Sequence, residues 1–165
     1  MAYSIRTVQT ALVALLSENN TSTSGLNLSA GMTATTAGLL KEVIAGTPQN
    51  APRTQQQLPC VWVGLDGDQE EWSSMGQGAE RKMRPSFELV VAAYASPAEG
   101  HDAAEAASAI LTDNIRTMLR NKPNMSNTVA WVRVTTVKYN ADFPGTDNTY
   151  VCASRISVEA QKFST

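Results

Sequence analysis

The stretch RPSFELVVAAYA, residues 84–95, decides the fold class of this chain. Its apolar residues recur at every second position, which is typical of an extended strand rather than of a helix. One face of this strand is formed by Phe87, Leu89, Val91 and Ala93. The opposite face is apolar as well and is formed by Val90, Ala92 and Tyr94. We therefore expect a strand whose two faces are both covered, with Pro85 near its start.

The residues that follow predict a long helix over 98–120, because apolar residues recur there at spacings of three and four. This stripe comprises Ala103, Ala107, Ile110, Leu111, Ile115, Met118 and Leu119. Arg116 and Arg120 near the carboxyl end suit the helix dipole, and Pro123 follows shortly after the end.

Two strands are expected after this helix, over 128–139 and 150–160, joined by a hairpin whose long tip spans 140–149. On the first of them, strict alternation places one set of residues on one face, namely Val129, Trp131, Thr135 and Val137. The same alternation places Val132 and Val134 on the other face.

Before the deciding stretch, residues 4–17 predict an amphipathic helix with Ser4 as its N-cap. A segment rich in Ser, Thr and Gly at 21–36 is typical of an exposed loop. The short apolar piece at 39–45 fits either a helical turn or a strand, and we favour a strand. A further strand is expected over 59–65, with Val61, Val63 and Leu65 on one face.

This order of elements predicts an α+β fold. We expect a mostly antiparallel sheet of about four to five strands, packed against an N-terminal helix and one long helix. The length of 165 residues fits a single domain spanning 1–165, with exposed excursions near 21–36, 66–81 and 140–149.

Charge and composition narrow the classes of function. The net charge of -2 argues against nucleic-acid binding as the main task. No apolar run approaches the roughly 20 residues of a membrane span, and the N-terminus lacks the pattern of a secretory signal. We therefore expect no membrane partner and no specific nucleic acid, and we expect synthesis in a cytoplasm.

The chemistry-bearing residues are sparse. His101 is the single histidine, and it lies where a helix is expected to start, so it reads more simply as an exposed residue than as a base. The acidic run that begins at Asp66 lacks the glycine and glutamate that a calcium loop needs. Cys60 and Cys152 are expected to be reduced, although a cross-strand disulfide is also possible. The sequence thus predicts no enzyme and no catalytic, cofactor or metal site.

The excursion at 66–81 is the candidate interface. It combines acidic residues, which are costly to bury unpaired, with two large apolar side chains. The residues of this interface hypothesis are Asp66, Asp68, Glu70, Glu71, Trp72 and Met75. We expect Trp72 to anchor a partner surface, whereas Trp62 and Trp131 belong to the core. The alternative is a mobile loop in solvent.

The pattern resembles the tail-completion proteins of tailed bacteriophages, in particular the tail terminator family. The resemblance covers most of the chain and begins with the helix over 5–16. It continues with GTP at 46–48, followed by LPCVWV at 58–63, and with a polar excursion that leads into RPSFELVV at 84–91. An Ala-rich helix before two closing strands completes it. The long segment at 21–36 departs from the family's pattern.

The resemblance implies a structural virion protein without enzymatic activity, located at the tail or neck after synthesis in the host cytoplasm. It implies a homo-oligomeric ring, typically a hexamer, that caps the tail tube. The implied partners are further copies of the chain, the tail tube protein and a neck or connector protein. Two alternatives stay open. One is a neck or head-completion protein of the head-tail connector, and the other is a small cytosolic α+β enzyme or ligand-binding domain.

Overall fold

The computed structural model describes residues 3–20, 40–48, 59–72, 80–94, 100–141 and 151–164. Its helices are α1 (Ile5–Asn19) and α2 (His101–Asn121). Its strands are β1 (Glu42–Ala45), β2 (Cys60–Trp72), β3 (Arg81–Tyr94), β4 (Trp131–Ala141) and β5 (Val151–Ser164). The expected loop at 21–36 lies outside the described residues. So does the expected hairpin tip at 140–149, except for Asn140 and Ala141, which end β4.

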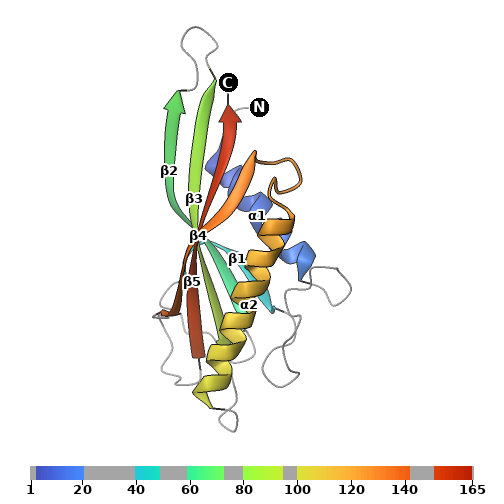
Figure 1. Ribbon diagram of the computed structural model, residues 1–165, viewed down its shortest axis with the longest axis vertical. Helices are drawn as coiled ribbons and strands as arrows, with labels where there is room; N and C mark the ends of the chain where they lie inside the picture. The colour runs from blue at the N-terminus through green and yellow to red at the C-terminus, as the bar shows by residue number, and fades with distance from the viewer. Residues whose placement is uncertain are drawn as a thin grey trace.

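The strands form one sheet in the order β1-β2-β3-β5-β4 (Figure 1). The pairs β2–β3, β3–β5 and β5–β4 are antiparallel, and the short β1 is parallel to β2. The predicted α+β fold, with a mostly antiparallel sheet, an N-terminal helix and one long helix, is confirmed. The preference for a strand within 39–45 is confirmed as well, at Glu42–Ala45.

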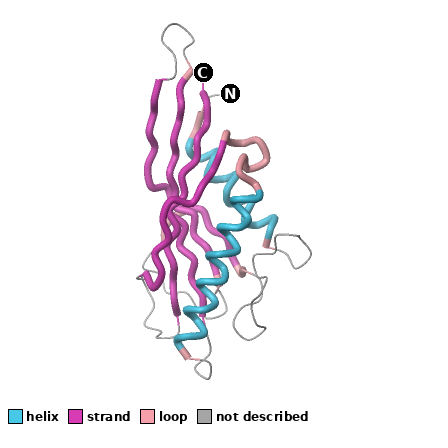
Figure 2. Tube along the Cα trace, in the orientation of Figure 1, coloured by secondary structure: helices cyan, strands magenta, loops and turns pink. Residues whose placement is uncertain are grey.

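Both helices lie against the same face of the sheet, where α2 runs alongside the strands (Figure 2). The alternating residues Phe87, Leu89 and Val91 of β3 are buried in the same cluster as apolar residues of α1 and α2. Burying a side chain of this size stabilises a fold by about 1.5–3 kcal/mol. This shared apolar core therefore holds the two helices on one face of the sheet. The apolar stripes of the helices and the alternating apolar residues of β3 meet in it.

The opposite face of the sheet carries a second buried cluster. It contains Cys60, Trp62, Val90, Ala92 and Ala153. The expectation that residues 84–95 are covered on both faces is thereby confirmed at Val90 and Ala92. Trp62 is a core residue, as expected.

Two side-chain amides tie α1 to β2 and to the segment just before β1. Gln9 Nε2 donates a buried hydrogen bond of 2.6 Å to the carbonyl oxygen of Val63. At the end of the helix, the amide of Asn20 both donates to and accepts from the backbone of Leu40, at 2.8 and 2.9 Å. Such bonds orient the helix on the strands, because a buried polar group without a partner is costly.

The predicted faces are wrong beyond Val134, and they are wrong at Val129, which precedes β4 and is buried in the same cluster as Val132. Val134 pairs with Val158 and Thr136 pairs with Ser157, so Thr135 is an extra residue in the ladder. Such a bulge reverses which face each later residue occupies. As a result, Val137 packs against the helix-side core together with Val134, and it does not share the face of Trp131 and Thr135.

Two expectations for β2 also need correction. The strand does not end at residue 65 but continues to Trp72, so residues 66–72 belong to a strand rather than to a loop. Leu65 does not join Val61 and Val63 in the core, because its side chain is 42% exposed. In the described part of the chain, no helix has the length and apolar character that crossing a membrane requires.

Candidate assembly interface

The candidate interface lies where β2 and β3, together with the end of β5, extend beyond the helices (Figure 1). We call residues 65–72 of β2 and 81–86 of β3 the arm. In β2, residues 60–64 are buried, whereas every residue from Leu65 to Trp72 is exposed. The sequence-predicted residues Asp66, Asp68, Glu70, Glu71 and Trp72 all lie in this exposed half. Met75 lies outside the described residues.

The outer edge of β2 is covered by other residues up to Gly64 and is exposed beyond it. On the buried half, β1 pairs with residues Cys60 to Val63. Beyond them, Thr47 lies so close that a Cβ atom on Gly64 would be 2.7 Å from its Cγ2. From Leu65 onward no described strand pairs with this edge of β2. This part of β2 is exposed, and an exposed strand edge of this kind can pair with another chain.

Two acidic residues of the arm, Glu70 and Glu71, form ion pairs across it. Glu70 Oε1 lies 3.0 Å from Arg81 Nη1, and Glu71 Oε2 lies 3.5 Å from Arg84 Nη2. These side chains are all more than a third exposed, so each pair contributes at most about 1 kcal/mol. The sequence indicated that the acidic residues face water or basic groups, and the structure shows both.

Trp72 is 57% exposed, and the guanidinium of Arg81 lies 4.3 Å from the centre of its ring. This cation–π contact holds the indole on the surface of the arm without burying it. Trp131 is only half-buried, with Arg133 at 4.8 Å from its ring, so the expectation of a core Trp131 is wrong.

The sequence did not single out Tyr3, which fixes the arm to the helix layer. Its hydroxyl donates a hydrogen bond of 2.9 Å to Asp68 Oδ2. Burial of the phenol, together with the hydrogen bond and the charge of Asp68, raises the pKa of Tyr3 above its usual value. The hydroxyl therefore remains a donor at neutral pH. Nothing in the sequence pattern signals a contact across 65 residues.

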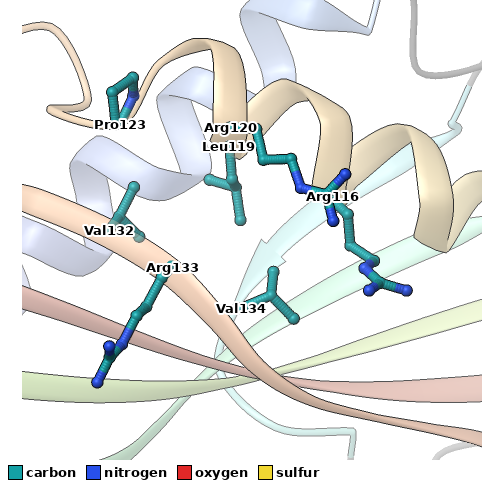
Figure 3. A pocket seen from close by; sticks show the side chains of 7 residues that line it. All are labelled: Arg116, Leu119, Arg120, Pro123, Val132, Arg133 and Val134. Atoms are coloured by element: carbon teal, nitrogen blue, oxygen red, sulfur yellow. The ribbon is translucent and has the colours of Figure 1, made fainter.

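A second feature that the sequence did not single out lies at the other edge of the sheet. A hollow of about 160 Å³ opens between the end of α2 and β4 (Figure 3). We call it the arginine groove, and it is lined by Arg116, Leu119, Arg120, Pro123, Val132, Arg133 and Val134. Figure 3 shows Arg116 and Arg120 side by side on α2, with the valines of β4 beneath them. The four-residue spacing of the two arginines was the signal available in the sequence.

The single histidine and the two cysteines lie away from the arm and the arginine groove. His101, Asp102 and Glu105 lie together at the start of α2, but all three are exposed. Cys60 and Cys152 are both free thiols, as expected, and they belong to clusters on opposite faces of the sheet. Burial and the charge of Glu105 raise the pKa of the Cys152 thiol, which donates a hydrogen bond to Asn140. Both effects favour the protonated form of the Cys152 thiol.

No protein-family model and no curated protein matches the chain. Among solved structures, the chain is similar to one from the "Virion of native gene transfer agent (GTA) particle". The two share 14% sequence identity and a TM-score of 0.44, over 99% of this chain and 100% of that chain. At this identity and score the similarity assigns no function.

Proposed function

We propose that the chain is a structural virion protein that forms a ring, caps the tail tube and joins the tail to the neck of a phage-like particle. The observation that carries this proposal is the arm, in which β2 is exposed from Leu65 to Trp72. An edge of this length that no described strand covers is unusual in a protein that acts as a monomer, because it is a template for pairing with another chain.

The surface composition supports an assembly role. The large apolar side chains that the described residues expose are Leu65, Trp72, Tyr139 and Phe163. Leu65 and Trp72 both belong to the arm, and an aromatic side chain surrounded by charges is typical of an interface anchor. The acidic residues Asp66, Asp68, Glu70 and Glu71 would then select a partner by charge.

The proposed partners follow from the resemblance of the sequence. They are further copies of this chain, with a hexamer as the expected ring, together with the tail tube protein and a neck or connector protein. Met75 and the expected hairpin tip at 140–149 belong to the proposed contact surfaces as well. The proposed role is not enzymatic.

Purified particles test the proposal. An antibody against the chain should label particles at one point between head and tail. When the chain is absent, preparations should contain heads and tails that are not joined. Cross-linking in the particle should capture the tail tube protein. Capture of connector proteins alone would support the alternative of a neck protein, and absence of the chain from particles would contradict a virion role.

A further inference from the structure

The outward side of α2 carries charges of opposite sign at its two ends. Asp102 and Glu105 lie near the start of the helix, and both are exposed. Arg116 and Arg120 lie near its end, where Arg120 is exposed and the Arg116 side chain is 37% exposed. The helix dipole favours this order of signs at the two ends. It does not decide on which side of the helix the charges lie, so their alignment is a separate observation.

These charges belong to one stripe along the helix, which we call the outer seam of α2. Its residues follow one another at alternating steps of four and three positions, namely Asp102, Ala106, Ala109, Asp113, Arg116 and Arg120. Glu105 flanks this stripe beside Ala106. All of these residues are exposed or partly exposed, whereas Leu111, Ile115 and Met118 on the opposite side of α2 are buried. Steps of four and three define the side that a helix presents to a second helix in a left-handed pair.

The charges of the seam are little used within the chain. Among the residues that the structure describes, Asp102, Glu105 and Arg120 form no ion pair. Arg116 Nη1 lies 3.8 Å from Asp113 Oδ1, and both side chains are more than a third exposed. Such a pair is weak, because water competes for both groups. The seam therefore presents charges that a second molecule can pair.

Small residues lie between the charged ends of the seam. Ala106 and Ala109, together with Asp102 and Glu105, line a shallow hollow of about 320 Å³. An alanine has no side chain beyond its Cβ atom, so a second helix can approach closely at this level. The hollow also leaves room for the aliphatic stem of an arginine whose guanidinium reaches the two carboxylates.

An antiparallel second helix brings opposite charges together at both ends. When two copies of α2 run antiparallel and are level with each other at their midpoints, Asp102 of one lies opposite Arg120 of the other. Ala106 then lies opposite Arg116 of the second copy, and Glu105 lies beside that arginine. A parallel second helix in register would bring acid against acid and arginine against arginine. The charge pattern therefore favours antiparallel pairing of two copies.

We propose that the outer seam of α2 docks antiparallel against the same seam of a second copy of the chain. Asp102 and Glu105 of each copy face Arg120 and Arg116 of the other. The contact uses the same surface on both copies, so it has a two-fold axis and closes after two copies. It joins two free subunits or two rings and does not itself build a ring. The inference therefore goes beyond the proposed function, and it requires neither the arm nor a virion.

Charge exchange in the full chain tests the recognition. Asp102→Lys with Glu105→Lys, and separately Arg116→Glu with Arg120→Glu, should each lower the association constant by about tenfold or more, because like charges then meet at both ends. A mixture of these two variants restores opposite charges at both ends and should associate as the original chain does. A variant with all four exchanges should associate with itself but not with the original chain.

A single exchange has a matched control on the other helix. Glu18→Lys makes the same change in net charge as Asp102→Lys, at an exposed residue of α1. Asp102→Lys should weaken association, whereas Glu18→Lys should leave it unchanged. Equal effects of the two exchanges would show that only net charge matters, and they would overturn the proposed contact.

Cysteine cross-linking tests the register without reversing any charge. Ala109 of one helix lies level with Asp113 of the other, so Ala109→Cys and Asp113→Cys chains that are mixed and oxidised should form a disulfide-linked dimer. The native Cys60 and Cys152 are buried, so the added thiol is the exposed one in each variant. Ser17→Cys on α1, which is exposed, replaces Ala109→Cys in the control and should abolish the dimer. Equal cross-linking with the control, or none with the proposed pair, overturns the inference.

Association is measured by analytical ultracentrifugation up to high protein concentration, because a single pair of helices is a small interface. Circular dichroism checks the fold of each variant, since the exchanged charges oppose the helix dipole. No recovery in the mixture, or a monomer at every concentration of the original chain, overturns the proposed contact. This result is separate from the proposed function. A chain that labels the particle without this contact retains the virion role, whereas a chain that forms the contact but is absent from particles loses that role alone.

Discussion

The two halves of β2 differ in their burial and in the strands that pair with them. From Cys60 to Gly64 the strand is buried between β1 and β3, with helices over one face and a second apolar cluster on the other. From Leu65 to Trp72 it is exposed and pairs with β3 alone among the described strands. The contrast teaches that burial follows from the elements beside a strand, and not only from alternation within it.

The sharpest form of this contrast lies within one row, where Leu65 pairs directly with Phe87. Phe87 is 1% exposed and Leu65 is 42% exposed. Phe87→Ala should lower the free energy of unfolding by about 3–5 kcal/mol, because it leaves a cavity in the core. Leu65→Ala should change it by about 0.5 kcal/mol or less. Urea denaturation of the two variants measures both, and similar losses would contradict the division of β2.

The boundary between the halves is tested at Gly64. Gly64→Ala should destabilise the fold by about 1–3 kcal/mol, because the new Cβ would lie 2.7 Å from Thr47 Cγ2. Thr47→Ser removes that methyl group and should restore most of the loss in the double variant. Gly67→Ala is the control on the exposed half, where the nearest atom is the Ser86 hydroxyl at 3.2 Å, and this side chain can rotate. Thermal denaturation that shows equal losses at 64 and 67 would argue against a boundary there.

Charge pairs on the exposed half should matter less. Glu70→Gln removes the pair with Arg81 and should lower the free energy of unfolding by at most about 1 kcal/mol, an effect that shrinks in high salt. Urea denaturation at low and high salt measures this difference. A loss that is large and independent of salt would indicate that the arm is buried against something in the isolated chain.

The smallest effect concerns Tyr3. Because its pKa is raised in the folded chain, the unfolded chain releases this proton first as the pH rises. The stabilisation is therefore complete below about pH 10, where an ordinary tyrosine titrates, and it is lost above that pH. Tyr3→Phe should weaken this alkaline loss of stability, as followed by denaturation at several pH values. An identical pH profile in the variant would show that folding does not raise the pKa of Tyr3.

Reading alternation in the sequence was most reliable where the strands are central. The pattern from Phe87 to Ala93 places each side chain on the correct face, because β3 has paired strands on both sides. The same reading failed at Val137, because a bulge at Thr135 changes the parity without any signal in the pattern. It also failed for residues 66–72, because exposed acidic residues in an arm and in a loop have the same composition.

The exposed residues of the arm were predicted in part. The sequence indicated the acidic residues and Trp72, since such a mixture fits poorly into a core. It did not indicate Tyr3 or the arginine groove, because both depend on contacts between segments far apart in the chain. Arg116 and Arg120 are separated from β4 by the turn after α2, and the hollow between them exists only once the helix lies on the sheet.

The sequence by itself determined the α+β class, the order of the elements and the inward faces of β3 and α2, because period and composition act over neighbouring residues. Only the tertiary structure decided where β2 stops being covered, which edge stays open and which charges meet. Those outcomes depend on strand order and register, which are set by the sum of long-range packing contacts and not by any local run of residues.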